Sequence, residues 1–198
     1  MISRYPIYIA AIGASAGGQH SIKEFFESIP SDLPVGFVIV THLFRDHKSQ
    51  LSSIVARYTD MQVHAVNGIM RVEAGHVYVM PEDVLMEIRN GFLYLRARPP
   101  HELINNSIDV FFESLAKDQK ERAVGIILSG MGTDGSKGAI KLFEHGGIVL
   151  VQEPNSTEFN GMPWSAVLND HPDYVLPPRQ LGEKLVNIVK AKQPKIAI

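Results

Sequence analysis

Short blocks of uninterrupted apolar residues recur along the chain, and segments with helical spacing separate them. Ile7–Ile12, Val35–Val40 and Val124–Ser129 are such blocks, and each predicts a strand buried on both faces of a sheet. Between the first two blocks, apolar residues at helical spacing predict a helix that Pro30 ends: Ile22, Phe25, Phe26 and Ile29. A strand–helix–strand order of this kind predicts parallel strands joined by right-handed crossovers.

The same helical spacing recurs further along the chain. It predicts a helix over residues 51–58, one that Ser107 caps, one with Leu142 and Phe143 on its apolar side, a short one from Gly161, and a last one over 181–189. Gly146-Gly147 is expected to end the third of these, because a C-cap needs backbone freedom. Residues 148–151 predict another buried strand.

The middle of the chain has a different pattern. His76–Met80, Val84–Ile88 and Phe92–Leu95 are short and strand-like, and Asn90-Gly91 is a strong signal for a two-residue hairpin. We therefore predict a small antiparallel region at about residues 76–96. The fold class predicted overall is α/β: a doubly wound, mostly parallel sheet with helices on both faces, in a single domain over 1–198.

The composition fits a soluble globular protein: 198 residues, 45% hydrophobic and 20% charged. A formal net charge of −2 gives no reason to expect a nucleic acid or an anionic membrane as partner. The chain has no cysteine, which excludes disulfides, thiolate zinc sites and a thiol nucleophile. No apolar run approaches the roughly 18–20 residues of a membrane span. We expect a cytoplasmic protein without membrane insertion.

Three polar residues follow three of the predicted parallel strands. Ser15 follows the first strand and His42 the second, while Asp134 lies in the loop after the strand that ends at Ser129. Ligands of open parallel sheets bind beyond the carboxyl ends of the strands, so we expect these side chains to meet at one edge. A hydroxyl, an imidazole and a carboxylate are the parts of a nucleophile, a base and a group that orients the base.

Each of the three residues has another interpretation that its local pattern leaves open. The loop Gly13–Gly18 could hold a phosphate, although Ser15 stands where the dinucleotide-binding pattern needs its second glycine. His42 could be structural, and Asp134 could be a helix N-cap or form an Asx turn. The spacing of His42 from the acidic and histidine residues after it matches no helical pair of metal ligands, so we expect no metal and no cofactor.

Together these motifs resemble the catalytic domain of the chemotaxis receptor methylesterase (protein-glutamate methylesterase). The resemblance spans nearly the whole chain. It is carried by Ile12–Gly18, Thr41-His42 and Val124–Gly135, with weaker matches at Gly75–Pro81, Ser107–Phe112 and Gly161–Pro163. It implies a doubly wound α/β catalytic domain without the phosphorylation-regulated receiver domain of the family.

The resemblance implies a serine hydrolase that removes methyl groups from glutamate γ-methyl esters on the cytoplasmic helices of chemoreceptors and releases methanol. It also allows deamidation of receptor glutamines. Ser15 matches the nucleophile of the family, His42 its general base and Asp134 its orienting carboxylate. The implied partners are methylated receptor helices, with a receiver domain or methyltransferase modules as further ones in a two-component signalling pathway. A docking module without catalytic activity is the alternative.

Oxyanion stabilisation is expected from the backbone. Met131 matches the position whose N–H helps to form the oxyanion hole of the family, and we infer a second donor at Ala16 or Gly17, where the helix after Ser15 begins. Ala16 departs from the family, which commonly has threonine there, and His42 is followed by Leu43-Phe44 instead of Met-Pro. These departures bear on rate and substrate choice.

Overall fold

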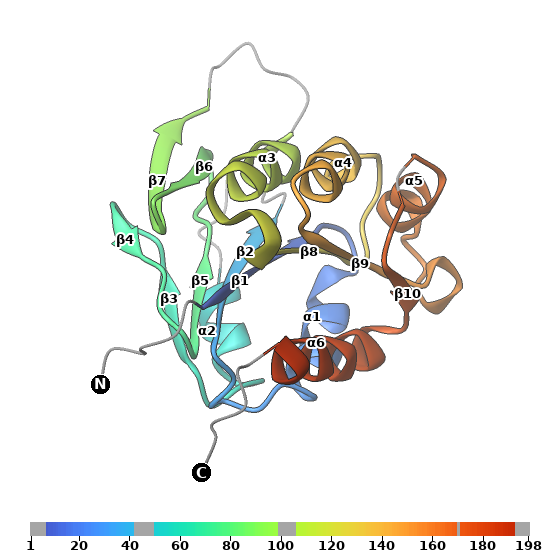
Figure 1. Ribbon diagram of the computed structural model, residues 1–198, viewed down its shortest axis with the longest axis horizontal. Coiled ribbons are helices and arrows are strands. Elements are labelled where there is room, and N and C mark those ends of the chain that lie inside the picture. Colours follow the sequence, from blue (N-terminus) through green and yellow to red (C-terminus); the bar gives the residue numbers. More distant parts are fainter. Residues whose placement is uncertain (1–6, 42–49, 99–105, 170, 193–198) are drawn as a thin grey trace.

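A seven-stranded sheet forms the centre of the molecule, with the strand order β10-β9-β8-β1-β2-β5-β3 (Figure 1). The computed structural model describes residues 7–41, 50–98, 106–169 and 171–192. Neighbouring strands of this sheet pair in parallel. The strands are β1 (Tyr8–Ala14), β2 (Val35–Thr41), β3 (Gln62–Ala65), β5 (His76–Val79), β8 (Ala123–Ile127), β9 (Ile148–Gln152) and β10 (Tyr174–Leu176).

Helices cover both faces of the sheet, as Figure 1 shows. One face carries α3 (Ser107–Gln119), α4 (Ser136–Glu144) and α5 (Gly161–Asn169), and the other carries α1 (Gly18–Phe26), α2 (Leu51–Val55) and α6 (Pro178–Lys192). Two short 3₁₀ helices, η1 (Lys120–Arg122) and η2 (Pro154–Ser156), lie in loops. The predicted doubly wound α/β fold is therefore confirmed.

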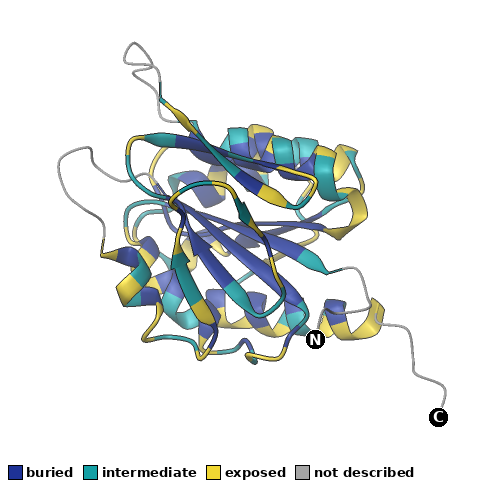
Figure 2. Ribbon diagram, turned by 90° about the vertical axis from the view of Figure 1, so that its left-hand side faces the viewer, coloured by how far each residue is buried: buried dark blue, intermediate teal, exposed yellow. Residues whose placement is uncertain are grey.

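Each face of the sheet has its own hydrophobic core. Along β1, Ile9 and Ala11 belong to the core under α3, whereas Ala10 and Ile12 belong to the core under α1. Figure 2 shows the central strands as an almost wholly buried layer. Because both faces exclude water, successive strand residues are all apolar, which is the physical origin of the uninterrupted blocks in the sequence.

A second, three-stranded sheet with the order β4-β7-β6 packs against α3. It consists of β4 (Met70–Arg71), β6 (Val84–Arg89) and β7 (Phe92–Ala97), and its pairs are antiparallel. The predicted hairpin turn is confirmed, with Asn90 at φ 52° and Gly91 at φ 75°. Asp118 of α3 accepts hydrogen bonds from the backbone N–H groups of both turn residues.

The placement of His76–Met80 in the antiparallel region was wrong. β5 lies in the main sheet, where it pairs in parallel with β2 and β3. Val77, Tyr78 and Val79 are buried like the residues of the other parallel strands, so continuous burial was the better guide than closeness to the hairpin. The edge strands β3 and β10 are partly exposed and escaped prediction, and α2 is shorter than the helix predicted over 51–58.

The order of the strands changes direction beside β1. On one side of β1 the sheet continues with β2, β5 and β3, and on the other side with β8, β9 and β10. The carboxyl ends of β1 and β8 therefore lie at the switch point, where open parallel sheets bind their ligands. Within the described ranges, none of the helices has the length and apolar character needed to cross a membrane.

Gly91→Ala is expected to lower the free energy of unfolding by about 1–2 kcal/mol, because a Cβ is strained in the left-handed region. Urea denaturation measures the change. Gly68→Ala is the matched control: no positive φ is recorded for Gly68, and a Cβ there would meet no atom within 4 Å. Equal stability of the two variants would contradict the strain at position 91.

Candidate active site

Ser15 stands on the turn that joins β1 to α1. Its backbone N–H donates to the Ser129 carbonyl at 2.9 Å, and its own carbonyl accepts from the Gly18 N–H at 3.0 Å. Gly17 has a φ of 71°, and a Cβ there would lie 2.7 Å from the Ser129 Oγ, so only glycine fits. The N–H groups of Ala16 and Gly17 donate to no other described residue. The turn thus offers two backbone donors beside the hydroxyl.

Ser129 anchors this turn to the end of β8. Its buried hydroxyl donates to the Ala16 carbonyl at 2.8 Å and lies 2.8 Å from the Thr157 Oγ1. Its backbone N–H donates to the Gln152 Oε1 at 2.8 Å. In the sequence pattern, Ser129 is only the last residue of a predicted strand. A hydroxyl at the end of a buried strand is expected to have hydrogen-bond partners, but the sequence does not show which residues these are.

The backbone after Ser129 passes directly beneath the Ser15 side chain. A Cβ on Gly130 would lie 3.0 Å from the Ser15 Cβ and 2.2 Å from the Met162 Sδ. The Gly130 carbonyl accepts from the Met162 N–H at 2.9 Å, which fixes this backbone to the first turn of α5. Close approach of the Ser15 turn and the β8 loop therefore depends on the absence of a side chain at position 130.

Met131 follows on the same loop, with 64% of its surface exposed. Its backbone N–H donates to no other described residue. Ser15 and Met131 thus belong to two loops in direct contact, each with backbone N–H groups that have no protein partner in the described ranges. Such groups are suited to stabilise a developing negative charge.

Asp134 lies deeper, with 7% of its surface exposed. Its Oδ2 accepts from the Ile108 N–H and its Oδ1 from the Asp109 N–H, both at 2.9 Å. These N–H groups belong to the first turn of α3, so Asp134 caps that helix from a distant loop. The prediction that the Ser107 side chain caps the helix was wrong: α3 begins at Ser107, and its N-cap residue, Asn106, makes no side-chain capping bond. The N-cap alternative for Asp134 concerned the helix that follows it, and it was wrong, because the N-cap residue of α4 is Gly135, which has no side chain to cap it. The bonds of Asp134 to α3 were not predicted.

Asp109 makes the reverse connection, which the sequence pattern did not predict. Its Oδ1 accepts from the Gly135 N–H at 2.9 Å and from the Gly138 N–H at 2.8 Å, at the start of α4. Burial is the main cause that raises the pKa of Asp109 to about 6, and the negative charge of Asp134 raises it further. The hydrogen bond from the Gly138 N–H lowers this pKa and offsets part of the shift. Each carboxylate therefore caps the helix of the other.

His42 lies outside the described residues. Thr41, the residue before it, ends β2 and pairs in register with Ala14, the residue before Ser15. The described histidines lie elsewhere: His64 and His76 face each other on β3 and β5, with their ring nitrogens 2.9 Å apart, and the rest are on helices or at the surface. The part of the chain that the structure describes contains no cluster of three potential metal ligands.

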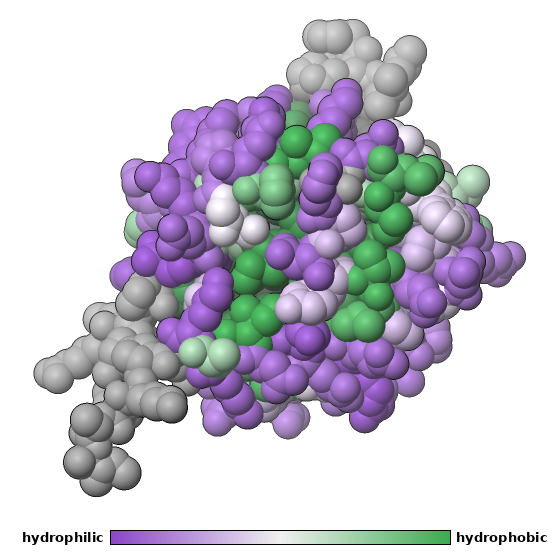
Figure 3. All heavy atoms as spheres, turned by 45° about the vertical axis from the view of Figure 1, so that its right-hand side comes forward, coloured by the Kyte–Doolittle hydropathy of each residue, from purple (hydrophilic) through white to green (hydrophobic). Residues whose placement is uncertain are grey.

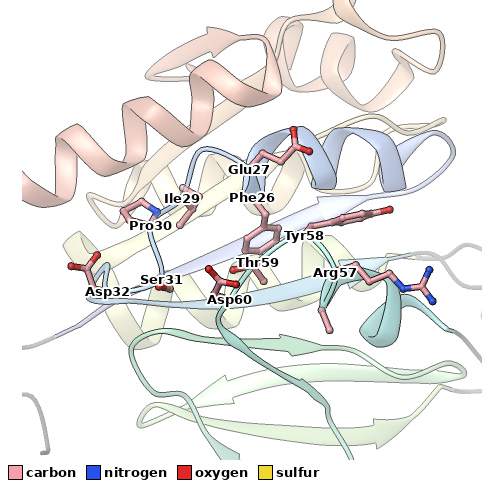
Figure 4. A pocket seen from close by; sticks show the side chains of 11 residues that line it. Phe26, Glu27, Ile29, Pro30, Ser31, Asp32, Arg57, Tyr58, Thr59 and Asp60 are labelled. Atoms are coloured by element: carbon pink, nitrogen blue, oxygen red, sulfur yellow. The ribbon is translucent and has the colours of Figure 1, made fainter.

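A cavity of about 490 Å³ lies away from these groups (Figure 4). The ends of α1 and α2 and the loops after them line it. Its aromatic residues are Phe26 and Tyr58, and its acidic residues are Glu27, Asp32 and Asp60. These segments lead into β2 and β3, so the cavity lies at the amino ends of the strands. It is on the edge of the sheet opposite to Ser15.

Apolar side chains gather on the surface over α4, α5 and β10 (Figure 3). The large exposed ones in this part of the chain are Phe143, Trp164, Leu168, Tyr174 and Val175. α5 starts against the Met131 loop, since a Cβ on Gly161 would lie 2.9 Å from the Gly132 nitrogen. This surface therefore adjoins the candidate site.

Comparison with known proteins identifies the family. The family model described as CheB methylesterase matches residues 10–185. The chain belongs to the CheB methylesterase family. The CheB methylesterase catalytic domain of Thermotoga maritima, a crystal structure, superposes with a TM-score of 0.84 at 28% identity, covering 93% of this chain and all of that one.

Two curated relatives in the family are named protein-glutamate methylesterase/protein-glutamine glutaminase. The one from Hydrogenovibrio crunogenus is 34% identical over 92% of this chain, and the one from Thermotoga maritima is 29% identical over 91%. The matched region is 49% and 54% of those proteins, so the chain spans about half the length of the curated relatives it matches. The family resemblance read from the sequence is confirmed.

Ser129→Ala is expected to lower the free energy of unfolding by about 1–3 kcal/mol, because the Ala16 carbonyl and the Thr157 hydroxyl lose a buried partner. Thermal and urea denaturation measure the loss. Ser53→Ala, at an exposed position of α2, is the control and should change stability by less than about 0.5 kcal/mol. A Ser129→Ala protein as stable as this control would show that the hydroxyl does not anchor the turn.

Proposed function

We propose that the protein is a serine hydrolase that removes methyl groups from glutamate γ-methyl esters on the cytoplasmic helices of chemoreceptors. One observation carries the proposal: in a chain of the CheB methylesterase family, the Ser15 N–H bonds to the Ser129 carbonyl and brings the Ser15 turn against the Met131 loop. The names of the relatives support the same reaction and extend it to deamidation of receptor glutamines.

In the proposed reaction, the Ser15 Oγ attacks the ester carbonyl carbon while His42 takes the hydroxyl proton. The carbonyl oxygen becomes an oxyanion, and the N–H groups of Met131 and of Ala16 or Gly17 donate to it. The C–O bond to the methoxy group then breaks, and methanol leaves with the proton from His42. Water attacks the acyl-enzyme with His42 again as base, which releases the glutamate carboxylate and restores Ser15.

Asp134 has the role of orienting His42 and stabilising its positive charge in this proposal. A carboxylate suits this role because the first turn of α3 holds it in place with two N–H groups, and a fixed carboxylate needs no reorganisation during the reaction. The register of Thr41 with Ala14 supports the role of His42, because the chain leaves β1 and β2 at the same level of the sheet.

The substrate in this proposal is the surface of a helix. The exposed Met131 and the apolar surface over α5 support an open approach to Ser15, in which the side chain of the substrate reaches the turn while its helix remains outside. Ala16 is next to the nucleophile and has no hydroxyl, which distinguishes this chain from the threonine common in the family.

Ser15→Ala is expected to lower methanol release from a methylated chemoreceptor at least about 10³-fold, because no other group supplies the nucleophile. The melting temperature should stay unchanged, since the Ser15 Oγ bonds to no other described residue. His42→Ala should be similarly severe. Release from Ser15→Ala at the wild-type rate would contradict the mechanism, and a wild-type protein that binds receptor helices but ignores a serine-directed phosphonate would favour the docking module.

Asp134→Asn is expected to lower kcat by about 10²–10⁴-fold and to destabilise the fold as well. The amide nitrogen replaces one of two oxygens that accept N–H groups of α3, which leaves a donor at the helix start without its partner. Steady-state kinetics and thermal denaturation of the same variant separate the two effects. Wild-type kcat in a destabilised variant would leave Asp134 with a structural role alone.

A further inference from the structure

Asp109 and Asp134 exchange partners across the start of two helices. Asp134 binds the first N–H groups of α3, the helix that contains Asp109, and Asp109 binds N–H groups at the start of α4, the helix that follows Asp134. The two carboxyl groups also influence each other: the negative charge of Asp134 raises the pKa of Asp109, and a hydrogen bond to Asp134 favours the protonated form of Asp109. The Gly135 N–H is shared, since it lies 2.9 Å from an oxygen of each.

This pair is unusual because two like charges are placed together in a half-buried site. A single carboxylate would suffice to cap a helix, and the second one opposes its own ionisation. Two helix N-termini, each with donors and a positive dipole end, offset part of that repulsion. The arrangement therefore concentrates negative charge beside Asp134, the carboxylate with a role in the proposed reaction.

We propose that Asp109 is a positioning residue of that reaction: it fixes the loop that carries Asp134 and places a second negative charge behind it. The inference rests on the proposed function. During acylation the base becomes positively charged, and a second carboxylate in a site of low water content adds to the attraction that stabilises it. When Asp109 is protonated, it donates a hydrogen bond to Asp134 instead and draws negative charge away from the base.

Within the described ranges, Asp134 is the charged group that acts on Asp109. β2 and β8, on which α3 packs, contain no titratable residue, and β1 has only Tyr8 at its far end. On α4, Lys137 is exposed and Lys141 pairs with Glu144 at the surface. On α3 itself, Glu113 pairs with Lys117, and Asp118 accepts hydrogen bonds from the Asn90-Gly91 turn. Glu87 pairs with Arg89 and Arg96 on the small sheet, and the charged residues of η1 follow the far end of α3.

The pKa of Asp109, about 6 in the folded protein against 3.8 for the ordinary side chain, gives the sign of the pH dependence. A raised carboxyl pKa contributes stability that is fully present below the unfolded pKa and is lost as the pH rises through the folded one. Asp109→Asn removes this dependence. The melting temperature of Asp109→Asn relative to the wild type should therefore rise between about pH 4 and pH 7.

Asp109→Asn is the decisive variant for catalysis. The N–H groups of Gly135 and Gly138 both donate to the Oδ1 of Asp109, and an asparagine retains this oxygen. On a methylated receptor we expect kcat to fall about tenfold at pH 8, with KM unchanged within about twofold. The acid limb of kcat/KM should move to lower pH by about half a unit to one unit, because the base loses a stabilising charge. A change in stability alone would produce neither effect.

Glu113→Gln is the matched control, since Glu113 is an exposed carboxylate one turn further along α3. It should leave kcat and the pH profile unchanged. Asp109→Ser, which keeps a capping oxygen without a charge, should reproduce the loss in Asp109→Asn. Wild-type kcat and pH profile in folded Asp109→Asn would overturn the proposal.

If neither Asp109→Asn nor Asp109→Ser folds, the pH profile of wild-type kcat tests the proposal. A second protonation below about pH 6 that lowers kcat, beside that of the base, is expected, and a profile with a single ionisation would overturn the proposal. Failure of the proposed function is recognised separately, because wild type and Ser15→Ala would then release methanol equally slowly. An active wild type with an unaltered Asp109→Asn rejects the role of Asp109 alone.

Discussion

Two carboxylates, Asp134 at the start of α3 and Asp109 at the start of α4, hold together the edge of the sheet that carries the candidate site. The first N–H groups of a helix have no partner within the helix, and at a buried N-terminus they must find one elsewhere. Asp134 and Asp109 supply those partners for α3 and α4. Ile108, next to this junction, packs so closely that a Cβ on Gly13 would lie 2.6 Å from its Cγ2 and one on Gly135 would lie 2.9 Å from the same atom. The capped start of α3 therefore packs against both β1 and the loop after β8.

The parallel sheet explains why these groups meet at all. The strands that lead to the candidate groups all point their carboxyl ends in the same direction, and the reversal of strand order beside β1 places the loops after β1 and β8 next to each other. Small residues let the two loops touch. Gly17 and Gly130 stand where a side chain would collide with Ser129 or with Met162, and the Ser15 turn rests on backbone as a result.

The sequence was most informative where one physical requirement acts alone. Burial on both faces makes the strands of the central sheet continuously apolar, and Asn90-Gly91 adopts the positive φ values that a tight hairpin needs, so both were predicted. The edge strand β3 was not predicted, because its partly exposed residues lack the continuous apolar pattern of a buried strand. The position of β5 was not predicted either, because the local sequence does not show with which strands it pairs. Ser15 and Asp134 were predicted from their places after strands, and Met131 from the family motif, and their roles stay predictions. Asp109 and Ser129 were missed because their importance arises from contacts with residues remote in sequence.

The hydrogen bond from the Ser129 hydroxyl to the Ala16 carbonyl joins residues 113 positions apart. Bringing the ends of such a long loop together has an entropic cost that contacts between residues close in sequence do not offset. The parallel pairing of β1 with β8 closes a loop of similar length. We therefore expect the turn around Ser15 to gain its final shape late in folding, after both halves of the sheet have come together. A nascent or partly unfolded chain would carry the serine without its supports, and so the reactivity proposed for Ser15 would depend on completion of the whole domain.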